Sequence, residues 1–444
     1  MPPAADRRYD TAMRVAYLAS GAAGMYCGSC LRDNRLAATL IAQGRDVVLM
    51  PLYTPLRTDE PDVSRTPVYF GGINVFFAHR FPRWARRFRF LTGVLDSPAL
   101  LGFAGRFAGK TKASELGALT HSMLQGEDGV LKPELEKLID GLRPQHLSLV
   151  NLPNLMFLGA AATLQRELGV KVVCTLSGED IFLDALTEPW RSRVFEEIRL
   201  RSDHVDAFIS VTKYYADHAA EHFNLPRERV HVVPLGISTA AFADRIEPSP
   251  TPTPTSHPIL GYLGRICPDK GLHNLVDAWL NVRKAGVTSR LSAAGYLGPQ
   301  DRAYLREIQQ RIDQAGASSD FEYRGELSWN EKIEFLKSLH VFSLPTVYRE
   351  AKGLPVLEAL AAGIPVVQPR HGSFPELVEA TGGGLLYDPD RPEELEAAIR
   401  KLLDDPELRT RLGREGQLRV RESFSETQMA QRTWKIYEAC VRGH

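Results

Sequence analysis

Two glutamates, Glu350 and Glu358, bracket the segment of this chain that is best suited to bind a ligand. Between them lie Gly353, which lets a backbone approach a ligand closely, and Pro355, a residue type tolerated in the first turn of a helix. The backbone N–H groups at a helix N-terminus attract an anion, and carboxylates accept hydrogen bonds from sugar or ribose hydroxyls. The segment therefore suits a ligand with phosphate in the middle and polyols at both ends. The alternative is an ordinary loop in which one glutamate is solvated and the other caps a helix or forms a salt bridge.

Two cations, Arg265 and Lys270, form the second candidate set. They follow the apolar run 259–263, which we predict to be the first strand of the second half of the chain. Arginine offers a planar bidentate fork and lysine a mobile point charge, so the two can bind one diphosphate. Because they stand after a strand and before a helix, we favour this interpretation over two surface cations beside a turn.

Both candidate sets need rigid elements to position them, and the sequence predicts two series of alternating strands and helices. Short apolar runs followed by turn residues and a helical pattern are typical of doubly wound parallel sheets in an α/β protein. The predicted strands of the first half are 14–19, 46–51, 146–150, 170–176, 207–211 and 230–234, with helices over 31–41 and 157–168. Those of the second half are 259–263, 290–294, 321–324, 341–344, 365–368 and 384–387. Such sheets bind ligands beyond the carboxyl ends of their strands.

The proline-rich segment 248–258 is the clearest predicted domain boundary. Its composition predicts a semi-extended linker between a first domain, 1–247, and a second domain, 259–422. The tail 423–444 is predicted to be a capped helix with an apolar side. Residues 54–144 show no regular pattern.

Composition argues against several classes of function. The chain of 444 residues has 54 basic and 54 acidic side chains, so its formal charge of zero gives no support for nucleic-acid binding. Its five cysteines are an odd and mostly scattered set, which argues against a disulfide framework and for a reducing compartment. The first residues lack the apolar segment of a signal peptide, and the weakly charged run 147–164 contains residues unsuited to a membrane span. We therefore expect a cytoplasmic protein.

The order of these motifs resembles that of the retaining glycosyltransferases with the GT-B fold, specifically glycosyltransferase family 4 (glycosyl transferases group 1). The resemblance is detailed over about 259–386 and coarser over nearly the whole chain. It implies two Rossmann-like domains facing across a cleft, the first for the acceptor and the second for the nucleotide-sugar, and a final helix that crosses back to the first domain. It also implies that a hexose-type sugar moves from a nucleotide-diphosphate donor to a carbohydrate, lipid or small-molecule acceptor. Neither a metal nor a cofactor besides the donor is implied.

The resemblance also implies roles for single residues. Arg265 and Lys270 would bind the donor diphosphate and stabilise the charge that builds on it as it departs. Glu350 would face the sugar as a third catalytic residue, and Glu358 would bind the ribose. The other implied donor-side residues are Gly24, Gly264, Ala351, Lys352, Gly353 and Leu354.

The first domain departs from the family pattern at Ser177. The family has a histidine near the reacting sugar, whereas this chain has Ser177, followed by Glu179 and Asp180 two and three residues later. Serine donates a hydrogen bond but carries no positive charge. Several interpretations stay open: a transferase whose site is adjusted by Glu179 or Asp180, a nucleotide-sugar-binding or regulatory protein with weakened transfer, and a GT-B enzyme of another type, such as a phosphorylase or an epimerase. The plainest alternative for these residues is an N-capped turn.

Three further motifs have competing interpretations. Cys27 and Cys30 form a C-x-x-C pair at an expected helix start, and we favour a structural or acceptor-lining role over a redox role. The other cysteines are isolated, so we expect no zinc site. Segment 76–90 interleaves aromatic residues with arginines, and contact with the inner membrane face, binding of an anionic acceptor and ordinary packing stay open. Asp388 and Asp390 are interpreted as an acidic turn and not as metal ligands.

Overall fold

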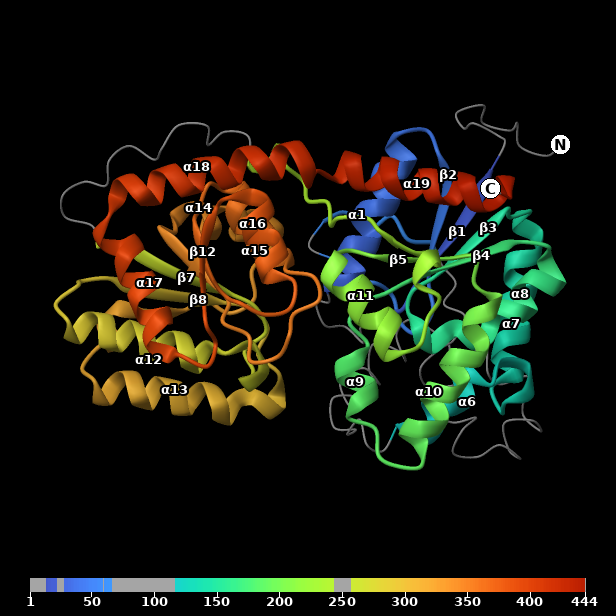
Figure 1. Cartoon of the computed structure of the whole chain (residues 1–444), viewed down its shortest axis with the longest axis horizontal. Helices are drawn as coiled ribbons and strands as arrows, with labels where there is room; N and C mark the ends of the chain where they lie inside the picture. The colour runs from blue at the N-terminus through green and yellow to red at the C-terminus, as the bar shows by residue number, and fades with distance from the viewer. Residues whose placement is uncertain (1–12, 22–27, 59, 66–115, 243–256, 444) are drawn as a thin grey trace. The chain divides into compact units, whose positions relative to one another are not determined.

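The computed structural model describes residues 13–21, 28–58, 60–65, 116–242 and 257–443. Contacts divide the chain into two compact units, one made of Met1–Val233 and Met429–His444 and the other of Pro234–Gln428. Each unit contains one six-stranded sheet with helices packed around it (Figure 1). Every pair of neighbouring strands is parallel. The prediction of two doubly wound α/β domains is therefore confirmed.

The sheet of the first unit has the order β2-β1-β3-β4-β5-β6. Its strands are β1 (Arg14–Ala19), β2 (Asp46–Pro51), β3 (Leu149–Leu152), β4 (Lys171–Thr175), β5 (Ala207–Ser210) and β6 (Val230–Val232). Its described helices include α1 (Gly28–Ala42), α6 (Gly117–Leu124), α7 (Lys132–Leu142), α8 (Ala161–Leu168), α9 (Asp180–Asp184), α10 (Trp190–Arg201) and α11 (Lys213–His222). Most strand residues are buried, as expected where helices cover a parallel sheet.

The sheet of the second unit has the order β12-β11-β10-β7-β8-β9. Its strands are β7 (Ile259–Leu263), β8 (Arg290–Ala294), β9 (Phe321–Tyr323), β10 (Val341–Ser343), β11 (Val366–Pro369) and β12 (Gly384–Tyr387). Its described helices include α12 (Leu272–Lys284), α13 (Arg302–Gln314), α14 (Trp329–Ser338), α15 (Leu354–Ala361), α16 (Phe374–Thr381), α17 (Pro392–Asp404) and α18 (Pro406–Ser423). Figure 1 shows α12 and α13 on one side of this sheet and α14, α15 and α16 on the other.

In both sheets the strand order reverses beside the first strand. The chain enters the second sheet at β7, runs outward through β8 and β9, and returns to β10 on the other side of β7. In the first sheet, β1 lies between β2 and β3. Doubly wound sheets bind ligands beyond the carboxyl ends of the strands at such reversals. Arg265 follows β7 and Glu350 follows β10, so the two predicted sets lie at the reversal of the second sheet.

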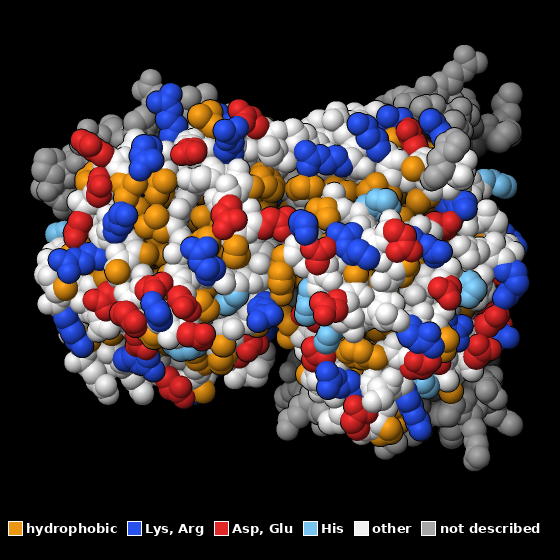
Figure 2. Space-filling model, viewed as in Figure 1, with side chains coloured by type: hydrophobic (Ala, Val, Ile, Leu, Met, Phe, Trp, Pro, Cys, Tyr) orange, Lys and Arg blue, Asp and Glu red, His pale blue; other side chains and the backbone are white. Residues whose placement is uncertain are grey.

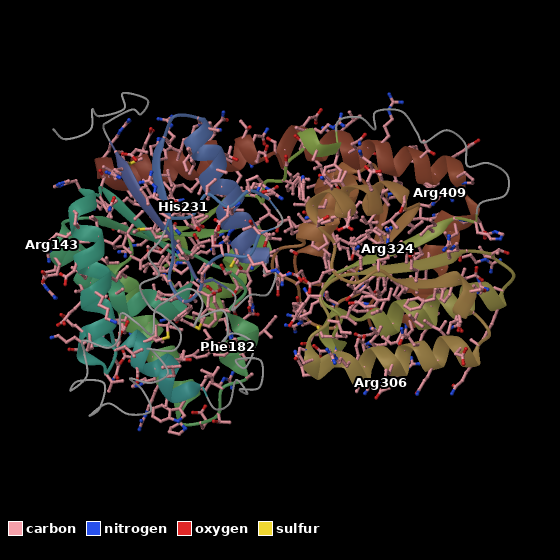
Figure 3. All side chains as sticks on the ribbon, turned by 180° about the vertical axis from the view of Figure 1, so that it is seen from behind. Arg143, Phe182, His231, Arg306, Arg324 and Arg409 are labelled. Carbon is pink, nitrogen blue, oxygen red and sulfur yellow. The ribbon has the colours of Figure 1, made fainter. Side chains whose placement is uncertain are left out.

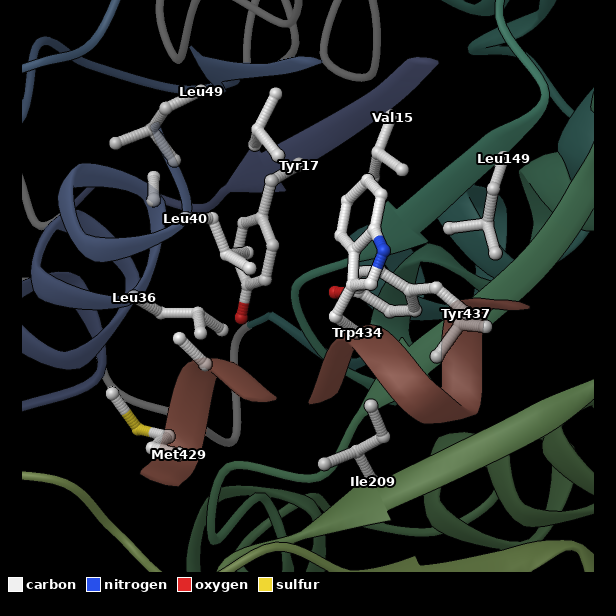
Figure 4. Packing of buried hydrophobic residues seen from close by; sticks show 14 of the residues in the cluster. Val15, Tyr17, Leu36, Leu40, Leu49, Leu149, Ile209, Met429, Trp434 and Tyr437 are labelled. Atoms are coloured by element: carbon white, nitrogen blue, oxygen red, sulfur yellow. The ribbon is translucent and has the colours of Figure 1, made fainter. Parts of the chain in front are cut away.

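Helix α19 (Glu426–Arg442) contributes to the hydrophobic core of the first unit. Met429, Trp434 and Tyr437 are buried in the same cluster as Tyr17 of β1 and Leu149 of β3 (Figure 4). At 3.6 residues per turn these three positions fall within about 140° of the helix circumference, so they lie on one side of the helix. The apolar side of α19 is therefore a structural part of this unit.

Some predicted boundaries were wrong. His146 was predicted to begin a strand, but it has a left-handed φ of 50° and β3 begins only at Leu149. The helix predicted over 157–168 is a 3-10 segment, Leu155–Ala160, followed by α8. In that segment the backbone of Gly159 packs so closely that a Cβ would lie 2.3 Å from the Met123 carbonyl oxygen. Backbone packing of this kind is not visible in the period of apolar residues.

The ends of the second unit also differ from the predicted ranges. Helix α18 continues to Ser423, so that the tail helix begins at Glu426 and not at 423. The compact units divide after Val233 and Gln428. Most of the predicted linker, 248–258, lies outside the described residues.

The surface carries charges of both signs. On the face shown in Figure 2, basic and acidic side chains alternate over both units, in keeping with a formal charge of zero. Within the described ranges, every helix is too short or too polar to span a lipid bilayer.

Candidate functional site

Lys270, Tyr348 and Glu350 form a partly buried polar cluster at the reversal of the second sheet. Lys270 Nζ donates to Glu350 Oε2 at 2.7 Å, and the Tyr348 hydroxyl donates to the same oxygen at 2.6 Å. Lys270 also donates to the Tyr348 oxygen, and its ammonium group lies 4.9 Å from the centre of that ring. Lys270 ends the 3-10 turn after β7, whereas Glu350 lies in the loop after β10. The fold thus joins two predicted residues that are 80 positions apart.

The electrostatics of this cluster keep Glu350 ionised. Burial alone would raise the pKa of Glu350, but the Lys270 ammonium and the Tyr348 hydroxyl outweigh burial and lower the pKa to about 2. Burial raises the pKa of Tyr348 well above its usual value, and the neighbouring carboxylate raises it further. The cluster is therefore a cation, a carboxylate and a neutral phenol at physiological pH.

Glycines and short backbone contacts hold the loop that carries Glu350. Gly353 has a φ of 70° and occupies the N-cap position of α15, where a Cβ would lie 2.3 Å from Leu377 Cδ1. A Cβ on Gly372 would lie 2.6 Å from the backbone N and O of Glu350. The Ser373 N–H donates to the Glu350 carbonyl at 2.7 Å. Residues after β11 therefore support this loop, and the sequence pattern did not single them out.

The other predicted residues of this loop lie at the start of α15. The Lys352 N–H donates to Glu350 Oε1 at 3.2 Å, which turns the carboxylate toward the loop. Ala351 and Leu354 are buried, and Leu354 is the first residue of the helix.

The predicted donor-side residue Gly264 lies in a different loop, directly after β7. It donates its N–H to the Ala294 carbonyl at 3.0 Å.

Glu358 forms a buried ion pair with a lysine that the sequence did not point out. Glu358 lies on α15, and its Oε1 accepts from Lys332 Nζ of α14 at 2.8 Å. The two side chains are only 3% and 8% exposed. The Lys332 ammonium also lies 4.6 Å from the centre of the Trp329 ring. No local motif marks Lys332, because its role depends on the packing of α14 against α15.

Arg265 and Lys270 occupy the same segment but have different partners. Arg265 is half exposed, its Nε donates to Cys267 Sγ at 3.2 Å, and its guanidinium lies 3.9 Å from Asp269. Lys270 instead contacts Glu350 and Tyr348, as described above. The exposed guanidinium of Arg265 is accessible to an incoming anion.

In the first unit, the loop after β4 places Ser177 beside the carboxyl end of β3. The Ser177 hydroxyl donates to the Pro153 carbonyl at 3.1 Å, and its N–H donates to Glu179 Oε2 at 2.8 Å. The second oxygen of Glu179 accepts from the Leu155 N–H at 3.2 Å. Glu179 therefore ties this loop to the chain that follows β3.

Asp180 is the first residue of α9, the helix that also contains Phe182 (Figure 3). The Tyr215 hydroxyl lies 2.9 Å from Asp180 Oδ1 and 3.1 Å from Glu179 Oε2. His218 Nε2 lies 3.4 Å from Asp180 Oδ2. Both predicted acidic residues thus connect the Ser177 loop to α11.

A buried arginine of α1 also reaches Ser177. Arg32 donates to Asp33 Oδ1 from Nη2 at 2.6 Å and from Nε at 2.9 Å, and its Nη2 lies 3.4 Å from Ser177 Oγ. Burial opposes the charge of Arg32, but the Asp33 carboxylate outweighs burial and raises the pKa of the guanidinium. The Tyr17 hydroxyl donates to Asp33 at 2.8 Å. No local motif distinguishes Arg32 and Asp33 from other polar positions of the predicted helix.

The remaining predicted positions have simple outcomes. Gly24, Cys27 and segment 76–90 lie outside the described residues, so their roles stay predictions. Cys30 is buried in the hydrophobic core of the first unit. Asp388 accepts from the Asp390 N–H at 3.0 Å within a turn.

Comparison with known proteins identifies matches over most of the chain. The model of the glycosyl transferases group 1 matches residues 244–419, and that of Glycosyltransferase Family 4 matches residues 120–241. The MMP alpha-(1->4)-mannosyltransferase of Mycolicibacterium hassiacum is 29% identical over 53% of this chain and 55% of its own length. The alpha-maltose-1-phosphate synthase of Mycolicibacterium smegmatis is 32% identical over 52% of this chain and 62% of its own length. The matched region thus spans little more than half the length of these relatives.

Solved structures share the fold over nearly the whole chain. Sucrose-phosphate synthase from Thermosynechococcus elongatus has a TM-score of 0.67 at 17% identity, covering 97% of this chain and 100% of that protein. HepE of Anabaena in complex with UDP-glucose has a TM-score of 0.65 at 14% identity, covering 96% and 100%. Two adjacent family matches and this shared architecture lead to one conclusion: the chain belongs to glycosyltransferase family 4 and has the GT-B fold.

Proposed function

We propose that this protein is a retaining glycosyltransferase that moves a hexose-type sugar from a nucleotide-diphosphate donor to a hydroxyl of an acceptor. The observation that carries the proposal is the Lys270–Tyr348–Glu350 cluster, which lies between the ends of β7 and β10 and next to the start of α15. This place combines a cation for phosphate, a carboxylate for sugar hydroxyls and a helix N-terminus. The match to the glycosyl transferases group 1 supports the same function independently of this geometry.

Donor binding would rearrange this cluster. Lys270 is neutralised by Glu350, and a diphosphate offers the ammonium group a stronger anionic partner. When Lys270 turns to the phosphate, the Glu350 carboxylate becomes available to accept hydrogen bonds from the sugar. Arg265, half exposed after β7, would add a second cation to the phosphate. The exchange couples recognition of the phosphate to recognition of the sugar.

The reaction replaces one bond to the anomeric carbon by another on the same face. The bond to the diphosphate oxygen breaks, the bond to the acceptor oxygen forms, and the acceptor proton passes to the departing phosphate. Charge builds on the diphosphate, where Lys270, Arg265 and the N–H groups at the start of α15 would stabilise it, often the largest catalytic contribution. The step requires no enzymatic nucleophile, in contrast to retaining glycosidases. We propose that it proceeds without a metal, so that a chelator leaves turnover unchanged.

The names of related proteins suggest the chemical class of the substrates. They include a mannosyltransferase, an alpha-maltose-1-phosphate synthase and a D-inositol 3-phosphate glycosyltransferase, names that refer to sugars or to inositol. HepE was solved with UDP and with UDP-glucose. We therefore propose a nucleoside diphosphate hexose as donor and a carbohydrate as the first acceptor class to test, ahead of a lipid or another small molecule.

Product analysis tests the proposal. The protein is incubated with UDP-, GDP- and ADP-hexoses and with a set of monosaccharides and sugar phosphates, and products are identified by mass spectrometry and NMR. The proposal predicts release of one nucleoside diphosphate, a product heavier than the acceptor by one hexose residue, and an unchanged anomeric configuration. An inverted configuration contradicts retention, and the absence of any hexosyl product contradicts transfer.

A second candidate function is binding of a nucleotide-sugar without efficient transfer. Ser177 favours it, because a neutral hydroxyl occupies the position after β4. This candidate predicts tight nucleotide binding with no hexosyl product. A phosphorylase would instead require inorganic phosphate, and an epimerase would return an intact nucleotide-sugar with a different hexose, so the same product analysis separates all four cases.

A further inference from the structure

Arg32 is a buried cation with one nitrogen, Nη1, that has no hydrogen-bond partner among the described residues. The residue is 3% exposed. Its Nε and Nη2 donate to Asp33, and Nη2 also approaches Ser177 Oγ at 3.4 Å. Its Nη1 is buried and makes no hydrogen bond to any described residue. A buried N–H without an acceptor costs about 1–3 kcal/mol, so a site that keeps one is suited to receive an oxygen atom from elsewhere.

The position of Arg32 in the sheet favours a ligand as the source of that oxygen. Arg32 lies in the first helix after β1, Pro153 follows β3 and Ser177 follows β4. The strands β1, β3 and β4 are neighbours, and the strand order reverses between β1 and β3. The carboxyl ends of strands at such a reversal form the ligand site of a doubly wound sheet.

A chain of buried hydrogen bonds fixes the Arg32–Asp33 pair. Tyr17 donates to Asp33 at 2.8 Å and lies 3.4 Å from Thr175 Oγ1. Asn151 Nδ2 donates to Thr175 Oγ1 at 2.9 Å. This network extends to α19, where the Tyr437 hydroxyl donates to Asn151 Oδ1 at 3.1 Å. A guanidinium held in this way is preorganised to present the two N–H groups of Nη1 in fixed directions.

The charge of the pair indicates which chemical group it suits. Asp33 neutralises Arg32 at 2.6 Å, so the pair carries no net charge. A phosphate here would be buried against a neutral pair and close to the Glu179 carboxylate, which is unfavourable. A sugar hydroxyl needs one donor and no countercharge.

We propose that Arg32 is an acceptor-binding residue of the first unit, whose Nη1 donates a hydrogen bond to a hydroxyl oxygen of a carbohydrate acceptor. Ser177 and Asp33 are the positioning residues that orient the guanidinium. This inference rests on the proposed function, since it names a residue for the acceptor of that reaction. An ordered water molecule on Nη1 is the alternative that the experiment must separate.

The test compares two reactions of the same donor. Arg32→Lys keeps a cation opposite Asp33 but lacks the guanidinium fork, and Arg32→Gln removes the charge. The matched control is Arg35→Lys, because Arg35 lies one turn along α1, is 2% exposed and pairs with the Glu60 carboxylate at 2.8 Å. Each variant is assayed for hydrolysis of UDP-glucose or GDP-mannose and for transfer to glucose, mannose and glucose 1-phosphate as probes. Melting temperatures are recorded alongside.

Hydrolysis uses water and needs no bound sugar acceptor, so the two rates report on different contacts. We expect Arg32→Lys to lower transfer by roughly tenfold or more, the effect of losing one hydrogen bond from a charged donor. Hydrolysis should stay within about twofold of the wild-type rate, since the donor site in the second unit is unaltered. The control should leave the ratio of transfer to hydrolysis unchanged.

Three results would overturn the inference while leaving the proposed function intact. The first is an unchanged ratio of transfer to hydrolysis in a folded Arg32→Lys protein. The second is an equal fall of both rates, which is expected for a structural arginine or a bound water. The third is loss of folding in both Arg32 variants. Failure of the proposed function gives a different result, because the wild-type protein would then release no nucleotide from any donor and form no product with any probe.

Discussion

At the scale of single residues, the proposed function requires the Lys270–Glu350 pair to link phosphate recognition to sugar recognition. Glu350→Gln keeps the shape of the side chain but removes its charge and the ion pair with Lys270. We expect kcat to fall by about 10²–10³-fold, the usual cost of one group that stabilises the transition state. The dissociation constant of the nucleotide should change far less, because phosphate contacts remain. Calorimetry and turnover measured on the same preparation check this, and an equal loss in both quantities would refute the assignment.

Testing Glu358 requires a double variant as well as a single one, because its partner Lys332 is buried. Glu358→Met alone removes the carboxylate that pairs with the buried Lys332 ammonium, which should cost about 3–5 kcal/mol of unfolding free energy. The double variant Glu358→Met/Lys332→Met should recover most of this stability, since both charges are gone. If Glu358 binds the ribose, both the single and the double variant should bind nucleotide more weakly than the wild type does. Urea unfolding and calorimetry measure the two effects, and full nucleotide affinity in the double variant would contradict the ribose role.

The ionisation of Glu350 also predicts how stability depends on pH. The carboxylate has a lower pKa in the folded protein, about 2, than the ordinary value of 4.5. Its stabilising contribution is therefore present above pH 4.5 and is lost as the pH falls toward 2, amounting to roughly 3 kcal/mol in full. Subtracting the unfolding free energy of Glu350→Gln from that of the wild type isolates this contribution. The difference should shrink between pH 5 and pH 3, and a constant difference would argue against an ionised, buried Glu350.

At the scale of elements, the sequence predicted the central strands better than it predicted the turns and short helical segments beside them. The runs that became β1 and β7 were found with their correct ends, because short apolar runs beside glycine turns are distinctive. The start of β3 and the 3-10 segment before α8 were missed, since a left-handed His146 and the close packing of Gly159 depend on tertiary contacts. Likewise, Glu350 and Lys270 were found by their motifs, whereas Lys332 and Arg32 have no local signal.

Helix α19 allows a direct test of packing at this scale. Trp434 is 4% exposed, its Nε1 donates to Glu438 at 2.8 Å, and the Arg45 guanidinium lies 4.9 Å from the ring centre. Trp434→Ala should lower the unfolding free energy of the first unit by about 3–5 kcal/mol, the range for deleting a large buried aromatic side chain. Lys435→Ala, an exposed neighbour on the same helix, is the control and should have little effect. Similar unfolding midpoints for the two variants would show that α19 adds little to the core.

At the scale of the whole molecule, each unit carries its own set of polar groups beyond the strands of a doubly wound sheet. The second unit presents cations, a carboxylate and a helix N-terminus, which are suited to phosphate and sugar. The first presents a hydrogen-bonded cluster around Arg32 and Ser177, in which Asp33 neutralises Arg32. This difference in charge is what the proposed function predicts for a charged donor in one unit and an acceptor with hydroxyl groups in the other.

The most direct test of the central claim is a thermal-shift measurement with UDP, GDP, ADP and their hexose derivatives at millimolar concentration. A ligand that binds only the folded state at a hundred times its dissociation constant adds about 2.7 kcal/mol, which should raise Tm by roughly 5 °C or more. We predict such a rise with at least one nucleotide-sugar, and its loss in the Glu358→Met/Lys332→Met variant. No rise with any of these ligands would contradict a donor site at Glu350 and Glu358.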